Sequence, residues 1–246
     1  MEVHKHPHHV THKKKWTEYL LEFFMLFLAV FLGFTAENVR ENISRNEHAN
    51  LLTGRLVKDL EQDTLNLGKC ISFESASINK IDTLFFALQK PLGSADLKLI
   101  QELIVNNFSY PVFNPAAASM AAINNASDIK QLAESDLPDL IAEYEYRTDV
   151  NKKIEDIFSK LLEQNLLPFF YQHFTPANAY AVFGNNASVL DAHVRNLTEE
   201  DMKELSVKIE SLKGVISHLI SSETDLKEKA GDLIKYTIDH FHLSHN

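Results

Sequence analysis

The strongest hydrophobic feature of the chain is an unbroken apolar run near the N-terminus. Residues 23–36 are apolar apart from Gly33 and Thr35, and residues 16–21 extend the run. As a helix, residues 16–36 would be about 31 Å long, which matches the hydrocarbon core of a bilayer. This pattern predicts a transmembrane helix over residues 16–36.

A cleaved signal peptide is the main alternative interpretation of this run. A cut after Ala36 would place the bulky Phe34 where the cleavage site needs a small residue. We therefore expect an anchor that is not cleaved.

The orientation of the anchor is predicted from the basic residues that flank it. Four lysines precede the span and three arginines follow it, namely Lys5, Lys13, Lys14 and Lys15 against Arg40, Arg45 and Arg55. The cluster beside the membrane favours a cytoplasmic N-terminus, because positive charge is retained on that side. We expect a cytoplasmic tail over residues 1–15 and a domain over residues 37–246 on the other side.

One face of the predicted span carries small and charged residues. They are Glu22, Ala29, Gly33, Ala36 and Arg40. Small residues let two helix backbones approach closely, and an intramembrane carboxylate normally faces a partner, so this face is predicted to carry assembly. The alternative for Glu22 is a position at headgroup level, reaching toward Lys14 or Lys15.

The region after the span has helical spacing and no proline before Pro91. Its periodic apolar positions are Leu56, Leu60, Leu67, Ile71, Ile78, Ile81, Phe85 and Leu88. This spacing predicts a long stalk helix that continues the anchor and ends near Lys90.

The C-terminal part, residues 199–241, has the most regular pattern in the chain. Thr198 and Asp201 form a predicted capping box at its start. The seam that follows alternates in steps of three and four, with Glu223 and Ala230 among the apolar positions Met202, Leu205, Ile209, Leu212, Ile216, Leu219, Leu226 and Leu233. Such a heptad pattern indicates a coiled-coil helix, whose partner is either the stalk helix of the same chain or a second chain.

Shorter helical patterns lie between these two regions. Ser94 is predicted to cap a helix that ends near Asn107, and a longer helix is expected after Ser135. The positions expected to be buried in the longer helix are Leu140, Tyr144, Ile154, Ile157, Phe158, Leu161 and Leu162. Almost nothing alternates with period two, so the predicted fold class is all-α, a helical bundle.

Residues 108–127 and 169–188 repeat one pattern, with 10 of 20 aligned positions identical. Asn114 and Thr175 precede prolines and are predicted N-caps. Asn125 and its equivalent Asn186 suit left-handed C-caps. We therefore expect two helix-linker-helix units related by a pseudo-two-fold axis.

Each copy of the repeat also begins with aromatic residues. They are Phe108, Tyr110 and Phe113 in the first copy, and Phe169, Tyr171 and Phe174 in the second. Aromatics at helix ends usually fill a core. The alternative is a symmetric pocket or partner surface lined by the two tyrosines.

Composition narrows the candidate chemistry. A net charge of -10 disfavours nucleic-acid binding, and the single cysteine, Cys70, is expected to be a partly buried free thiol. The seven glycines are scattered, and the chain has no phosphate loop, nucleophile elbow or HExxH motif. We expect neither an enzymatic activity nor a cofactor.

Histidines gather near both ends of the chain. The N-terminal group, His4, His6, His8 and His9, could hold a transition metal weakly. The alternative is a solvated tail that contacts anionic headgroups when it is protonated. We expect no specific metal site.

The segments "HPHHVTHKKKWTEYLLEFFMLFLAVFLGFTAENVRE" and "NPAAASMAAINNASDIKQLAESDLPDLIAEYEY" resemble a family of uncharacterised bacterial single-span membrane proteins. Members of that family have a His-rich tail, a span containing Glu and a "GFxAEN" exit, and their internal segment usually has a glycine where this chain has Asn-Ala-Ser. The resemblance implies an inner-membrane protein with a helical periplasmic domain, and it brings no known activity.

These expectations lead to two hypotheses about function. The first is a membrane-anchored scaffold or accessory subunit of an envelope complex, which binds the bilayer, further copies of itself and another membrane protein. The second is a sensory helical bundle, which would have to signal through a partner because a tail of about 15 residues is too short to fold into an output module.

Overall fold

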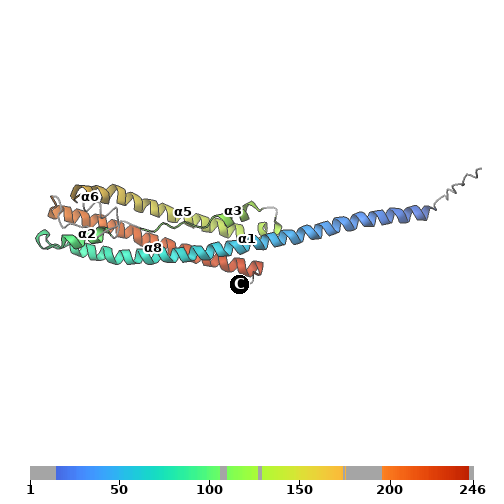
Figure 1. The fold of residues 1–246 in the computed structure, drawn as a ribbon, viewed down its shortest axis with the longest axis horizontal. Helices are drawn as coiled ribbons and strands as arrows, with labels where there is room; N and C mark the ends of the chain where they lie inside the picture. The colour runs from blue at the N-terminus through green and yellow to red at the C-terminus, as the bar shows by residue number, and fades with distance from the viewer. Residues whose placement is uncertain (1–14, 106–109, 127–128, 174, 176–195, 244–246) are drawn as a thin grey trace, which may run out of the picture. The chain divides into compact units, whose positions relative to one another are not determined.

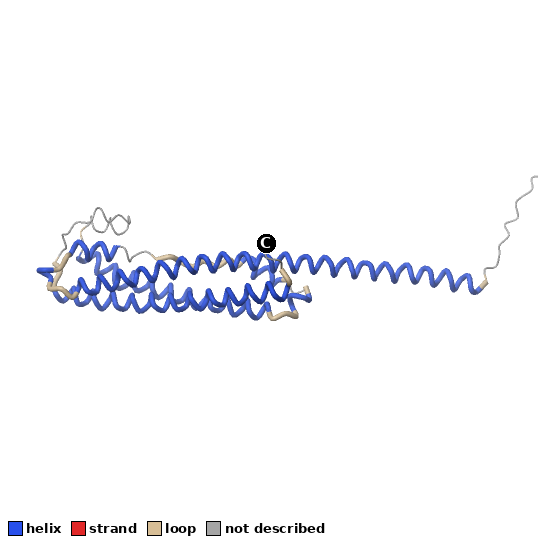
Figure 2. Tube along the Cα trace, turned by 90° about the horizontal axis from the view of Figure 1, so that it is seen from below, coloured by secondary structure: helices blue, strands red, loops and turns tan. Residues whose placement is uncertain are grey.

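The structure, a computed structural model, describes residues 15–105, 110–126, 129–173, 175 and 196–243. Every regular element in these residues is a helix, and none of them lies in a strand (Figure 2). The predicted all-α fold class is therefore confirmed.

Three long helices and several short ones make up the described chain. The long helices are α1 (Trp16–Leu88), α5 (Leu137–Leu161) and α8 (Glu199–Phe241). The short ones are α2 (Leu97–Val105), α3 (Ala118–Asn125), α4 (Lys130–Ala133) and α6 (Leu167–His173), with a 3-10 turn at Leu92–Ser94 and a π-helical segment at Leu162–Leu166. The chain divides into two compact units, residues 1–49 and 50–246.

The first unit contains the N-terminal part of α1, whose described residues are exposed almost throughout. Its apolar stretch has a mean hydropathy of 2.0, with none of it buried. Phe27 stacks on Phe23 and on Phe31, with ring centroids 6.5 and 6.2 Å apart. Within the described residues, this is the one helix long and apolar enough to cross a membrane.

In the second unit, α5 and α8 run beside the C-terminal part of α1, with α2 and α6 at one end of this bundle and α3 near the other (Figure 1). Lys213 of α8 pairs with Asp82 of α1, and Lys227, further along α8, lies against Gly68, which comes earlier in α1. Rising residue numbers in α8 thus meet falling numbers in α1. The two helices are antiparallel.

α5 and α8 are also antiparallel. Lys229 of α8 pairs with Glu143 of α5 at 3.1 Å, and further along α8 the hydroxyl of Tyr236 accepts from the backbone N–H of Asp136 at 2.9 Å. These contacts fix the register of the helices at the surface of the core.

Each long helix presents one seam of buried residues spaced by three and four. In α1 the seam is Thr53, Leu56, Leu60, Asp63, Leu67, Cys70, Glu74, Ser77, Ile81, Leu84 and Leu88. In α5 and the π-helical segment it includes Leu137, Ile141, Tyr144, Asn151, Glu155, Phe158 and Leu162. Helices with such seams bury an apolar stripe against one another.

Two details of the predicted seams are wrong. Ile157 of α5 is 50% exposed, and Leu140 is only partly buried, because the buried face passes through Ile141, Asn151 and Glu155 instead. In α1, Ile71, Ile78 and Phe85 flank the seam rather than forming it. In both helices the buried seam includes polar side chains. A prediction from apolar residues alone leaves the seam at these positions.

Helix ends agree with the sequence at one site and differ at another. The predicted capping box is present, because the N–H of Thr198 donates to Asp201 Oδ2 at 2.7 Å and the N–H of Asp201 donates to Thr198 Oγ1 at 3.2 Å. Ser94 does not cap α2. Asp96 does so, accepting from the N–H of Leu99 at 3.0 Å, since Ser94 belongs to the preceding 3-10 turn.

The predicted caps of the first repeat copy are also wrong. Residues 110–117 form no regular element, and α3 begins only at Ala118, so Asn114 does not cap it. Asn125 is the last residue of α3 and is not left-handed, since positive φ among the described non-glycine residues occurs at Asn196 and His242. Asn186 and most of the second copy lie outside the described residues.

Candidate functional site

The five residues of the predicted assembly face, Glu22, Ala29, Gly33, Ala36 and Arg40, are all exposed in the first unit. A Cβ added to Gly33 would have no neighbour within 4 Å. Along this face the helix therefore has room for another helix backbone to approach closely.

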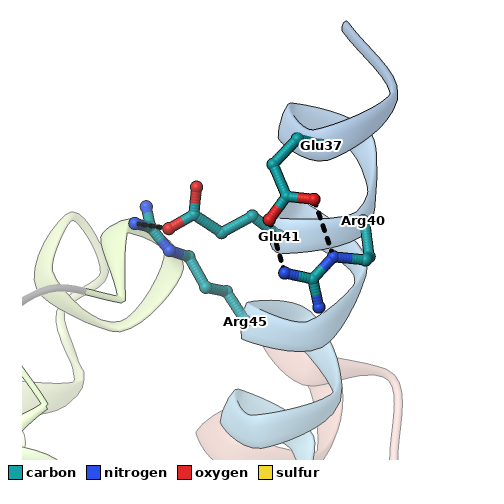
Figure 3. Close-up of polar contacts among 4 residues, drawn as sticks. All are labelled: Glu37, Arg40, Glu41 and Arg45. Carbon is teal, nitrogen blue, oxygen red and sulfur yellow. Dashed lines mark hydrogen bonds and ion pairs between the residues drawn. The ribbon is translucent and has the colours of Figure 1, made fainter. Parts of the chain in front are cut away.

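Charged residues begin directly after the apolar run and pair along the helix surface (Figure 3). The Arg40 guanidinium donates to both carboxylate oxygens of Glu37, and Arg45 donates to Glu41 at 2.6 Å. These i,i+3 and i,i+4 pairs are exposed, so they contribute little to stability. They mark residue 37 as the start of a polar helix surface.

The predicted seam of α8 is buried throughout within the described chain: Met202, Leu205, Ile209, Leu212, Ile216, Leu219, Leu226 and Leu233 are each exposed by no more than 3%. Contacts with α5 and α1 of the same chain cover this helix. The seam therefore serves the folding of the single chain.

The six aromatics of the repeat do not share one environment. Phe113 and Phe169 are buried, and Tyr110 packs edge-on against Phe158, with centroids 4.4 Å apart. Tyr171, the counterpart of Tyr110, lies in α6 and is 60% exposed. The expectation that the aromatics of the repeat fill the core therefore fails at Tyr171, and the alternative of a symmetric environment for the two tyrosines is not found either. Phe108 and Phe174 lie outside the described residues.

The N-terminal histidines His4, His6, His8 and His9 also lie outside the described residues. Within the part of the chain that is described, no group of three or more His, Cys, Asp and Glu side chains has the geometry of a metal site. A histidine contact that sequence spacing did not suggest joins α6 to α8, where His173 Nε2 lies 3.7 Å from Asp201 Oδ1.

A layer of buried polar residues crosses the middle of the bundle. Glu74 of α1, Glu155 of α5 and Glu223 of α8 are exposed by 2%, 6% and 0%, and each occupies a seam position. Cys70 and Asn151 belong to the same layer. Three carboxyl groups from three helices thus meet where an apolar layer would be more stable.

The segment between α2 and α3 is attached to this polar core by its backbone. The N–H of Phe113 donates to Glu155 Oε1 at 3.1 Å, and the N–H of Ala116 donates to Asp63 Oδ1 at 3.1 Å. The Tyr144 hydroxyl donates to Asp63 Oδ2 at 3.0 Å. These carboxylates thus bind two backbone donors of residues 110–117, those of Phe113 and Ala116, and so compete with helix formation there.

Burial dominates the electrostatics of the layer. Desolvation raises the pKa of Glu74 to about 7, and raises that of Glu223 to about 9 with a further contribution from the charge of Glu74. The same effect raises the pKa of Glu155 and Asp63, although the backbone donors of Phe113 and Ala116 partly offset it. The chemistry available to these residues is the uptake and release of protons.

Cys70 is a buried free thiol, as predicted. Burial and the nearby carboxyl groups of Glu223, Glu74 and Glu155 raise its pKa to about 12. A thiol with so high a pKa is a poor nucleophile at neutral pH, so the layer lacks a reactive cysteine.

Two members of this layer are predicted from the sequence, Cys70 as a partly buried thiol and Glu223 within a run of seam leucines. The burial of Glu74, Asn151 and Glu155 is not predicted. The signal that could have found them is the heptad spacing of the seam, in steps of three, four or seven residues. In α1 it leads from Leu67 through Cys70 and Glu74 to Ile81. In α5 it leads from Tyr144 through Asn151 and Glu155 to Phe158.

A shallow groove of about 570 Å³ lies on the outside of the second unit. Phe85 of α1 and Gln89, directly after this helix, line one side of it, and Lys203, Val207 and Glu210 of α8 line the other. It is open to solvent and does not reach the buried layer.

The chain was compared with known proteins by sequence and by fold. No protein-family model, curated protein or solved structure matches it. The exposed apolar stretch of α1 and the buried polar layer of the bundle therefore carry the functional proposal.

Proposed function

We propose that this protein is a membrane-anchored helical scaffold or accessory subunit, which acts through protein–protein assembly. The observation that carries the proposal is the exposed apolar stretch of α1. It combines a mean hydropathy of 2.0 with complete exposure, and the core helix of a soluble protein would bury most of such a surface. A bilayer is the environment that fits its length and composition.

The order of the two units along the chain supports assembly. A helix that enters the bilayer at residue 16 and leaves it at residue 36 continues as the same helix into the bundle. The bundle is thus attached to the anchor without an intervening linker, which suits a protein that holds partners near a membrane surface. The exposed Ala29, Gly33 and Ala36 would pack against a second helix in the bilayer.

The proposed location rests on the charges that flank the span. The Lys13 to Lys15 cluster beside the span favours a cytoplasmic tail, which would place the bundle in the periplasm. The resemblance to bacterial single-span proteins supports an inner membrane. In this proposal the partners are further copies of the chain and another membrane protein of the envelope.

The test is purification of the full-length chain from its native membrane in a mild detergent, followed by quantitative mass analysis of the bound proteins. The proposal predicts that the chain is recovered in a fixed ratio with itself or with one membrane protein. Recovery of the chain only as a monomer, in detergent and after crosslinking in intact membranes, would contradict it.

Sensing is the second candidate function, and the buried polar layer favours it. A bundle with three carboxyl groups in its core is less stable than a bundle whose core is entirely apolar. A ligand could therefore shift its packing readily. This candidate predicts that a specific metabolite raises the melting temperature of the full-length protein. A panel of metabolites without any effect would count against it.

A further inference from the structure

Two of the buried carboxyl groups, those of Glu74 and Glu223, differ from the others because no described residue donates a hydrogen bond to them. In the described part of the chain, all four of their oxygens are buried without a hydrogen-bond donor. Glu155, by contrast, accepts from Phe113 N–H and from the Asn151 amide at 3.2 Å. Asp63 likewise has two donors.

Within the described residues, no positive charge is seen to act on the pair either. Besides the two carboxyl groups themselves, the charge that acts on it is that of Glu155 of α5, and the thiol of Cys70 on α1 lies close enough to be influenced by all three. The lysine of α8 on this side is Lys227, which is exposed and lies against Gly68. Lys152 of α5 acts on Glu155 and is exposed as well. Among the described residues, the charges that act on the pair itself are thus acidic.

A buried pair of this kind cannot remain doubly ionised at low cost. Two carboxylates are acceptors only, so they repel each other and no hydrogen bond forms between them. A proton on either one creates an O–H donor that the other carboxylate can accept, and the two side chains then satisfy each other. Burial, the missing donors and the missing cation all favour the protonated pair.

We propose that Glu74 and Glu223 form a proton-binding site that locks α1 to α8, and that loss of the proton loosens the bundle at this level. This site lies in the core of the bundle, and its response does not depend on whether the chain spans a membrane. It gives the bundle a built-in response to pH, with the proton as the ligand.

The direction of the response follows from the pKa values. Those of Glu74 and Glu223 rise from 4.5 to about 7 and about 9 on folding. A group whose pKa is raised in the folded state stabilises that state fully below its unfolded pKa, and this stability is lost as the pH rises through the folded pKa. The contribution of the pair to stability is therefore greatest below about pH 4.5, decreases as the pH rises, and is gone above about pH 9.

The test is chemical unfolding of the full-length protein in detergent, monitored by circular dichroism and repeated at several pH values from 6 to 9. We expect the unfolding equilibrium constant to increase at least about tenfold between about pH 6 and pH 9, since each unit of pKa difference contributes up to tenfold. Glu223→Gln should reduce this change and stabilise the protein at the alkaline end. Glu228→Gln, an exposed change on the same helix, is the matched control and should leave the response intact.

A stability that stays level or increases from pH 6 to pH 9 would overturn the proposal, and so would a Glu223→Gln variant with the wild-type response. If this variant does not fold, infrared spectroscopy of the wild-type chain decides the question. A carbonyl band of a protonated carboxylic acid at neutral pH, lost at alkaline pH, is expected. Its absence at neutral pH would overturn the proposal equally.

Discussion

Tyr144 of α5 donates its hydroxyl to Asp63 Oδ2 of α1 at 3.0 Å, in a part of the core where both side chains are 1% exposed. The same carboxylate accepts from the backbone of Ala116. Asp63 thus joins two long helices to the segment that precedes α3.

Tyr144→Phe removes this donor with almost no change in shape. Because Asp63 would then keep only a backbone donor, we expect the free energy of unfolding to fall by about 1–3 kcal/mol. Denaturant unfolding of the full-length protein measures the effect. Tyr146→Phe removes a hydroxyl from a residue that is 63% exposed and serves as the control. Equal stability of the two variants would show that the Tyr144 bond contributes nothing.

Cys70 offers a probe of the same core. Its pKa of about 12 leaves little thiolate at pH 8, and its side chain is buried. We expect a maleimide to label the folded protein slower than the urea-unfolded protein by a factor on the order of a hundred. Since the chain has a single cysteine, mass spectrometry gives the rate directly. Similar rates in the two states would mean that the core opens readily at this level.

Gly33→Leu tests the predicted assembly face of the anchor. A leucine at this position would keep two helix backbones apart, so we expect a smaller assembly in detergent, measured by light scattering. Phe31→Leu changes the opposite side of the helix and should leave the mass unchanged. If Gly33→Leu also has the wild-type mass, this face does not carry assembly.

The sequence predicted the all-α class and the register of α8, because a leucine occupies every second position of its seam. It predicted the other two seams less well. Glu74, Asn151 and Glu155 are polar residues at core positions, and a pattern of hydrophobic residues alone assigns such residues to the surface. Their burial follows from the packing of α1, α5 and α8, which no local pattern contains.

The caps of the repeat were missed for a related reason. Asn114 precedes a proline, which is a sound local signal for a helix start. In the folded chain the backbone donors on either side of it, at Phe113 and Ala116, are bound by Glu155 and Asp63. These partners lie 42 and 53 residues away in sequence. Tertiary hydrogen bonds therefore outweigh the local preference.

Residues 16–36 are proposed to anchor the protein in a bilayer, and extraction of native membranes at alkaline pH measures whether they do. We expect the wild-type chain to stay with the lipid. A Phe27→Lys, Phe31→Lys double variant should be released more readily, since each charge costs about 2.5–3.5 kcal/mol at the centre of a span. Release of most of the wild-type chain into the supernatant would show that these residues do not form a membrane anchor.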